Sequence, residues 1–126
     1  MSEIRDELKY TTDHEWTRIE GGFAIVGITD HAQSELGDIV FVSLPQVGDI
    51  AKSGDSIGTI EAVKTVAEIY SPVSGEIVEV NGALADAASV MNQDPYGKGW
   101  IAKIKITNPS EVNALLDAQA YASHIG

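Results

Sequence analysis

The sequence contains no cysteine, which excludes disulfide bonds, thiolate metal sites and a cysteine nucleophile. Basic residues are also scarce: 8 Lys and Arg stand against 19 Asp and Glu, and the formal net charge is -11. A basic face for nucleic acid, or for the anionic surface of a membrane, is therefore not expected. The chain lacks any apolar run long enough to cross a bilayer. These absences favour a soluble protein that meets other proteins.

The first ten residues, MSEIRDELKY, have neither the apolar core of a secretory signal nor the acid-poor, Arg-rich composition of a transit peptide. We therefore expect a cytoplasmic protein, with the mitochondrial matrix as the alternative for a chain that has lost a presequence. The length of 126 residues predicts one domain over 1–126, large enough for a core. We expect residues 1–9, which are rich in charge, to be loosely ordered, and the protein to be a monomer.

Short apolar segments bounded by glycine and proline predict a protein built mainly of β-strands. The continuous apolar run IVFVSL at 39–44 predicts a buried strand. Closely spaced turns at Gly48 and Gly54 favour a compact barrel or sandwich over a doubly wound sheet. The remaining strands are expected at 15–19, 23–28, 57–63, 66–70, 76–80 and 100–106.

Helices are expected at three places. Thr29 or Asp30 can cap a short helix that ends at Gly37. An alanine-rich segment at 83–90 predicts a short helix or turn. The sequence NPSE, with Asn as a capping residue and Pro at the first helical position, predicts the start of a C-terminal helix over 108–122.

One lysine, Lys64, stands at the turn between two of the predicted strands, in the stretch GTIEAVKTVAEIYSPVSG. A lone exposed lysine is usually ordinary surface. Its neighbours, however, are small or apolar, whereas a free turn favours Gly, Asn or Asp. These neighbours are Ala62, Val63, Thr65 and Val66. An apolar collar around an exposed amine favours recognition of that amine by another protein.

No catalytic or metal-binding motif is present. The three histidines, His14, His31 and His124, do not follow the HExxH pattern or a similar ligand spacing, so we expect no metal site. The sequence has no Gly-x-Ser-x-Gly elbow and no glycine-rich phosphate loop. We therefore expect a protein without a catalytic activity of its own.

Four segments in order resemble the H-protein family of the glycine cleavage system. They are YTTDHEW (10–16), VGITDHAQSELGDIVFVSLPQVG (26–48), IEAVKTVAEIYSPVSGEIVEVN (60–81) and DPYGKGW (94–100). The segment NPSEVNALLDAQAY near the C-terminus is similar too, so the resemblance covers nearly the whole chain. It implies a mainly β barrel-sandwich hybrid with short helices and a C-terminal helix, and lipoic acid amide-linked to Lys64.

The resemblance also implies a non-catalytic carrier in glycine catabolism. Such a carrier takes the aminomethyl group of glycine from a pyridoxal-phosphate decarboxylase (P protein) to a tetrahydrofolate-dependent aminomethyltransferase (T protein). A dihydrolipoamide dehydrogenase (L protein) reoxidises the arm, and a lipoyl ligase or transferase attaches it. A further role as a relay that hands lipoate to other acceptors stays open.

In this family the loaded arm folds against the carrier, and a carboxylate can hold its ammonium by a charge-assisted hydrogen bond. Glu15, in the matched HEW segment, is the first candidate for this role, and Asp13 and Glu68 are weaker ones. The sequence departs from the usual family pattern in reading EAVKT around the lysine and PYGKGW in the later loop. In PYGKGW, Gly97 and Lys98 stand where the family usually has two acidic residues, which argues against a role for acidic side chains in this loop.

Three other carriers or binding domains are alternatives. Biotin acceptors resemble Met-Lys-Met at the lysine, whereas this chain has Val63-Lys64-Thr65. Lipoyl domains of 2-oxo-acid dehydrogenases favour Asp-Lys-Ala and carry Ala/Pro-rich linkers, which are lacking here. The last alternative is an unmodified domain that only binds other proteins.

Overall fold

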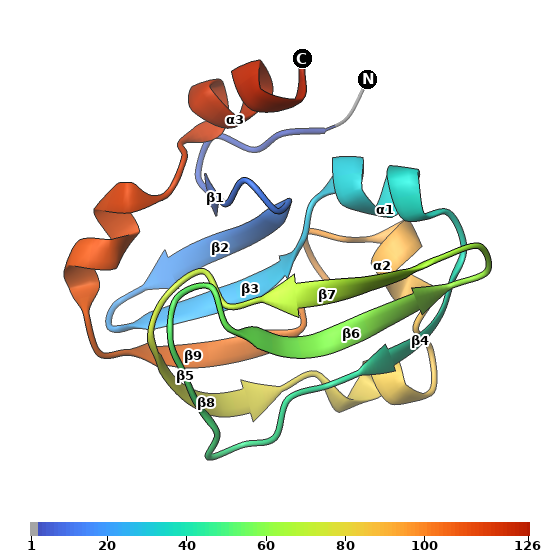
Figure 1. Ribbon diagram of the computed structural model, residues 1–126, viewed down its shortest axis with the longest axis horizontal. Coiled ribbons are helices and arrows are strands. Elements are labelled where there is room, and N and C mark those ends of the chain that lie inside the picture. Colours follow the sequence, from blue (N-terminus) through green and yellow to red (C-terminus); the bar gives the residue numbers. More distant parts are fainter. Residues whose placement is uncertain (1–2) are drawn as a thin grey trace.

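A computed structural model describes residues 3–126 of the chain. It contains two antiparallel β-sheets that pack face to face, with short helices at their edges (Figure 1). The larger sheet has six strands in the order β1-β2-β3-β9-β8-β5, and the smaller has the order β4-β6-β7. The mainly β barrel-sandwich hybrid predicted from the sequence is thus confirmed.

The larger sheet is assembled from segments far apart in the sequence, because β9 pairs with both β3 and β8. Its strands are β1 (Lys9–Tyr10), β2 (Glu15–Glu20), β3 (Phe23–Ile28), β5 (Ile50–Ala51), β8 (Gly75–Val80) and β9 (Ala102–Ile106). The smaller sheet consists of β4 (Ile39–Ser43), β6 (Ser56–Ala62) and β7 (Val66–Tyr70). Most strands therefore lie where their apolar patterns predicted them.

Helix α1 (Asp30–Leu36) also follows its prediction. The Thr29 side chain accepts a hydrogen bond from the Ala32 backbone amide and caps the first turn. Gly37 ends the helix with φ of 77°, a conformation that favours glycine. The alanine-rich region forms a 3-10 helix, η1 (Gly82–Ala85), followed by α2 (Val90–Gln93).

The main core lies between the two sheets. Ile39, Val42, Ile60 and Ile69 of the smaller sheet face it. Opposite them lie Ile28, Leu84, Met91, Ile101 and Ala102. The prediction that 39–44 is wholly buried was wrong, however: β4 is an edge strand of the smaller sheet, and Val40 and Phe41 are exposed.

A second, aromatic cluster ties the two chain ends to the larger sheet. Tyr10 and Tyr121 stack with ring centroids 4.5 Å apart, and Leu8, Trp16 and Tyr96 are buried beside them. The close approach of the Trp16 indole depends on Gly27 in the neighbouring strand. A Cβ atom at Gly27 would lie 2.6 Å from the indole ring.

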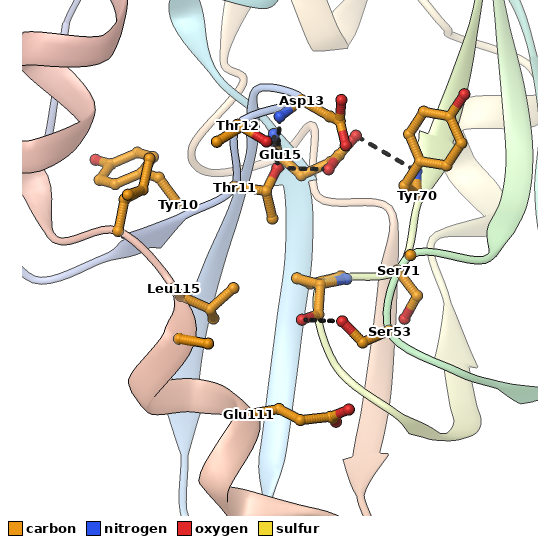
Figure 2. Close-up of a pocket in the computed structure, with 14 residues that line it drawn as sticks. Tyr10, Thr11, Thr12, Asp13, Glu15, Ser53, Tyr70, Ser71, Glu111 and Leu115 are labelled. Atoms are coloured by element: carbon orange, nitrogen blue, oxygen red, sulfur yellow. Dashed lines mark hydrogen bonds between the residues drawn. The ribbon is translucent and has the colours of Figure 1, made fainter.

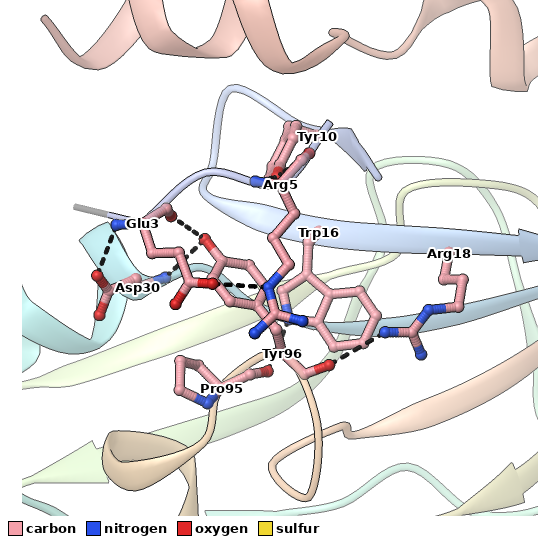
Figure 3. A network of polar contacts seen from close by, with 8 residues as sticks. All are labelled: Glu3, Arg5, Tyr10, Trp16, Arg18, Asp30, Pro95 and Tyr96. Carbon is pink, nitrogen blue, oxygen red and sulfur yellow. Dashed lines mark hydrogen bonds and ion pairs between the residues drawn. The ribbon is translucent and has the colours of Figure 1, made fainter. Parts of the chain in front are cut away.

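The N-terminal segment is more ordered than predicted, except that residues 1 and 2 lie outside the described part. Figure 3 shows the contacts that hold it: the Tyr96 hydroxyl donates to the Glu3 carbonyl at 2.5 Å, and the Tyr10 hydroxyl donates to the Arg5 carbonyl at 2.8 Å. The side chain of Leu8 is buried. The charge-rich composition of residues 3–9 hid this packing, because it rests on only two apolar side chains, Ile4 and Leu8, and on hydrogen bonds from tyrosine hydroxyls to the backbone.

The C-terminal segment differs from the single helix predicted over 108–122. It forms a 3-10 helix, η2 (Pro109–Ala114), and then α3 (Ala118–Ile125). Asp117 caps α3 through a hydrogen bond from the Ala120 amide. Asn108 makes no capping bond, and Leu116 instead pairs with Tyr10 through two backbone hydrogen bonds of 2.8 Å. This pairing with β1 interrupts the helix.

Candidate functional site

Lys64 lies in the turn between β6 and β7, as the sequence predicted. The turn closes with a hydrogen bond of 2.8 Å from the Ala62 amide to the Thr65 carbonyl. A second bond of 3.0 Å, from the Val63 amide to the Asp38 carbonyl, ties the turn to the chain between α1 and β4. The backbone that carries the lysine is therefore held in place from two sides, at one end of the molecule (Figure 1).

The side chain of Lys64 is exposed. Within residues 3–126, no hydrogen bond or ion pair is formed by its ammonium group. Its stem passes close to the end of α1, since a Cβ atom at Gly37 would lie 3.7 Å from Lys64 Cε. An unpaired, accessible amine on a fixed turn is what an enzyme that acylates lysine requires.

An exposed apolar surface surrounds this amine. Val63 and Val66 on either side of the turn expose 75% and 62% of their area. Val40 and Phe41 are also exposed, on the strand that pairs with β6. Exposing apolar side chains to water is unfavourable, so their presence beside one lysine favours contact with a partner protein that would cover them.

The three candidate carboxylates line one cleft. Asp13, Glu15 and Glu68 border a space of about 200 Å³ between α1 and the smaller sheet. Its apolar lining includes Ile28, Ala32, Leu36, Ile60 and Ala67. Leu36 belongs to the last turn of α1, next to the Gly37 that the Lys64 stem approaches. The cleft therefore reaches the end of α1 that the Lys64 stem approaches, and its lining combines this apolar surface with carboxylates and His14.

Glu15 differs from the other two carboxylates because it is buried, with 2% of its area exposed. The Thr11 hydroxyl donates to Glu15 Oε1 at 2.6 Å, and the Tyr70 amide donates to Oε2 at 3.3 Å (Figure 2). Burial raises the pKa of Glu15 to about 7, although these two hydrogen bonds oppose the shift. A cation that reaches Glu15 would therefore stabilise its ionised form, which burial disfavours.

Asp13 and Glu68 are exposed side chains. Glu68 Oε2 accepts a hydrogen bond of 2.7 Å from the Ser56 hydroxyl. Solvent already stabilises their negative charge, so a cation gains less from either of them than from Glu15. Burial thus separates Glu15 from the other two carboxylates, and a sheltering role for any of the three stays a prediction.

Glu15 also borders a second and larger cleft of about 250 Å³ (Figure 2). That cleft lies toward Ser53, Ser71 and Glu111 rather than toward α1. The smaller cleft, in contrast, is lined by Leu36, next to the Gly37 that the Lys64 stem approaches. The smaller cleft is therefore the better candidate for a group attached to the lysine.

Sequence reasoning missed the two residues that hold the Glu15 carboxylate. Thr11 lies four residues before Glu15 in a β-turn region, and Tyr70 lies 55 residues after it. The threonine could have been found, since a hydroxyl that close in the chain often bonds a nearby acceptor. The Tyr70 amide could not, because its contact with Glu15 depends on how the two sheets are placed relative to each other.

The chain is similar to proteins of one family over almost all of its length. The sequence model of the glycine cleavage H-protein family matches residues 8–126. A glycine cleavage system H protein of Chlorobium limicola is 58% identical over 125 residues, which cover 98% of each chain. One of Symbiobacterium thermophilum is 51% identical over 121 residues, which cover 96% of this chain and 94% of that protein.

A solved structure agrees with the sequence relatives. The crystal structure of a glycine cleavage system H protein from Mycobacterium marinum superimposes with a TM-score of 0.90 at 43% sequence identity. The match covers 98% of this chain and 99% of that one. Within residues 3–126, the structure has no helix long and apolar enough to span a membrane.

Proposed function

The chain belongs to the glycine cleavage H-protein family, and we propose that it carries lipoic acid on Lys64 as the shuttle of that system. The single observation that supports the proposal best is the free, exposed amine of Lys64 on a turn that is anchored from both sides. When bound, the lipoyl group supplies a disulfide that accepts the aminomethyl group of glycine and is left as a dithiol once that group is passed on.

In this proposal the protein supplies attachment, orientation and shelter, and its partners supply catalysis. A P protein loads the carrier, a T protein unloads it, and an L protein restores the disulfide. A tethered arm raises the effective concentration of its cargo at each partner's site. The predicted monomer and the predicted cytoplasmic location are part of this proposal.

The apolar cleft offers a resting place for the arm. An aliphatic chain laid along Leu36, Ile60 and Ala67 loses contact with water, which stabilises the folded-back position. Strand β7 leads from the lysine turn to Tyr70, whose amide bonds Glu15. At about 3.3 Å per residue, the five residues of β7 span roughly 15 Å, a distance that suits a long tether.

Glu15 would then meet a cationic amine at the end of this path. Its carboxylate is buried among neutral partners, so an ammonium group would gain a charge-assisted hydrogen bond in a low dielectric. Little water reaches that carboxylate, because Glu15 is 2% exposed. Glu15 thus acts as a positioning residue that shelters the cargo, and no bond is made or broken at its atoms.

Intact-mass analysis of protein from lipoate-replete cells tests the attachment. The wild-type chain should carry one lipoyl group, and Lys64→Arg should carry none. Lys52→Arg, which changes another exposed lysine, should keep the modification. A biotin-sized mass increase, or a lipoyl group that persists in Lys64→Arg, would contradict the proposal.

A second measurement tests the role of Glu15. The lifetime of the aminomethyl-loaded protein should shorten severalfold in Glu15→Gln, because an uncharged amide holds an ammonium less strongly than a carboxylate does. Glu68→Gln, on the exposed side of the same cleft, should change the lifetime little. Equal lifetimes in Glu15→Gln and wild type would remove the sheltering role and leave Lys64 as the carrier site.

A further inference from the structure

The rings of His31 and His124 both lie near that of His14, which lines the smaller cleft, although the three histidines are far apart in the sequence. The ring centroids of His14 and His31 are 4.8 Å apart, and those of His14 and His124 are 5.7 Å apart. Glu35 joins the first two: potential ligand atoms of His14, His31 and Glu35 all lie within 4.8 Å of one another. Two imidazoles and a carboxylate are a ligand set that zinc favours.

Two of these residues stand one helical turn apart on α1. His31 and Glu35 are separated by four positions, so their side chains lie on the same face of the helix. His31 Nε2 is 3.2 Å from Glu35 Oε1. Tetrahedral zinc, with ligand bonds of about 2.0–2.2 Å, separates its ligand atoms by roughly 3.3 Å. This pair therefore already has the spacing that a bound ion requires.

The third residue, His14, is held in place by the surrounding structure. Its backbone has φ of 71°, which is uncommon outside glycine, and its Nδ1 lies 2.9 Å from the Tyr121 hydroxyl. The same hydroxyl lies 2.8 Å from Thr29 Oγ1. In the tautomer with Nδ1 protonated, His14 donates to Tyr121, Tyr121 donates to Thr29, and Nε2 is left as a free acceptor. Such outer contacts orient the histidines of metal sites.

The geometry points to a site for a divalent transition ion of the zinc class, bound by His14, His31 and Glu35. Nothing in the proposed carrier role requires this site. Asp13, Glu15 and Glu68 line the same cleft, and the chain carries a net charge of -11, so a cation is attracted there. Three protein ligands leave the fourth tetrahedral position open to water.

Small side-chain movements complete the site. The separation of up to 4.8 Å must shrink by about 1.5 Å to reach the tetrahedral spacing. Because His31 and Glu35 are already 3.2 Å apart, the movement must bring this pair and His14 together, and the side chains of His31 and Glu35 are 23% and 65% exposed. His124 is engaged elsewhere, since its Nε2 lies 3.1 Å from the Thr12 carbonyl. The sequence predicted no metal site because spacing along the chain does not reveal a set assembled from a turn and a helix.

Calorimetric titration of untagged, full-length Lys64→Arg protein with Zn²⁺ tests the inference, and Co²⁺ serves as the spectroscopic probe. The Lys64→Arg background removes any lipoyl thiols, so failure of the metal site is distinguishable from failure of the carrier role. We expect one equivalent of Zn²⁺ to bind. Losing one ligand in His31→Gln or Glu35→Gln should weaken binding by at least about tenfold, and Tyr121→Phe by about tenfold.

His124→Gln is the matched control, because it removes a neighbouring imidazole that is outside the ligand set. It should leave the affinity within about twofold, and the visible spectrum of the Co²⁺ form should stay unchanged. His31→Gln and Glu35→Gln change side chains of α1 that are 23% and 65% exposed, and α1 has no buried residue, so both variants should fold. Three results would each overturn the site: no Zn²⁺ binding to the Lys64→Arg protein, an affinity in His31→Gln and Glu35→Gln equal to that of the Lys64→Arg protein, or a loss of affinity in His124→Gln as large as theirs.

Discussion

The backbone amide of Tyr70 donates a hydrogen bond of 3.3 Å to the buried carboxylate of Glu15. This contact joins the larger sheet, through β2, to the strand that leads away from the lysine turn. A carboxylate placed there faces a backbone amide and a threonine hydroxyl, and burial raises its pKa to about 7. Glu15 is the residue proposed to bind the amine of the loaded arm. Without a cation beside it, its ionised form lowers the stability of the folded protein.

The first prediction concerns Glu15 and pH. Its folded-state pKa of about 7 lies above the ordinary value of 4.5, so the folded protein keeps this proton over a range in which the unfolded chain has lost it. Stability is fully retained below the lower value and falls as pH rises through about 7, by up to about 3 kcal/mol. Glu15→Gln should remove most of this loss.

Urea unfolding at pH 5 and pH 8, in buffer with EDTA, measures the effect. The free energy of unfolding of Glu15→Gln minus that of wild type should be about 2–3 kcal/mol larger at pH 8 than at pH 5. Glu68→Gln is the control, since its side chain is exposed, and should show no such change. A difference between Glu15→Gln and wild type that does not vary with pH would contradict the prediction.

The second prediction concerns the contact of Gly27 with Trp16. Gly27→Ala should lower the free energy of unfolding by about 1–3 kcal/mol, because the new methyl group overlaps an indole that is locked in the core. Thermal unfolding followed by tryptophan fluorescence measures the loss. Gly22→Ala introduces the same methyl group into open space and should change stability far less. Equal effects of the two substitutions would show that the indole moves aside.

The third prediction concerns the apolar surface beside Lys64. Val63→Ser should slow lipoylation by a lipoyl ligase severalfold while leaving stability within about 0.5 kcal/mol, because the side chain is exposed and contributes little to the core. Val47→Ser changes an exposed valine remote from the turn in sequence and should leave the rate unchanged. Initial rates of modification with purified ligase compare the two. Equal rates for Val63→Ser and wild type would remove the recognition role.

The fourth prediction concerns how η2 is attached. The Glu111 carboxylate accepts hydrogen bonds from the amide and the hydroxyl of Ser74, at 2.7 and 2.9 Å. Glu111→Ala should cost about 1–3 kcal/mol and increase hydrogen exchange in 109–116, since it leaves the Ser74 amide without this acceptor. Glu76→Ala, at an exposed position of β8, should not alter exchange there. Unchanged protection in Glu111→Ala would show that the backbone pairing of Leu116 suffices.

Local pattern was enough to place most elements of this protein, because strand periodicity, caps and turn residues act over a few positions. Thr29 and Gly37 mark the two ends of α1 through their own side-chain and backbone preferences. The apolar residues around Lys64 are likewise its neighbours in the sequence. The same reasoning failed for Asn108, whose capping sequence lost to the pairing of Leu116 with Tyr10. It also failed for Val40 and Phe41, because an apolar run does not reveal that its strand lies at a sheet edge.

The sequence by itself determined that the lysine stands at a turn, that the protein is mainly β, and which family it resembles. Only the tertiary structure decided that Glu15 is buried while Asp13 and Glu68 are exposed. It also decided that His14 meets His31 and Glu35. The reason is physical: burial and the convergence of side chains depend on how distant segments pack, and no local spacing encodes them.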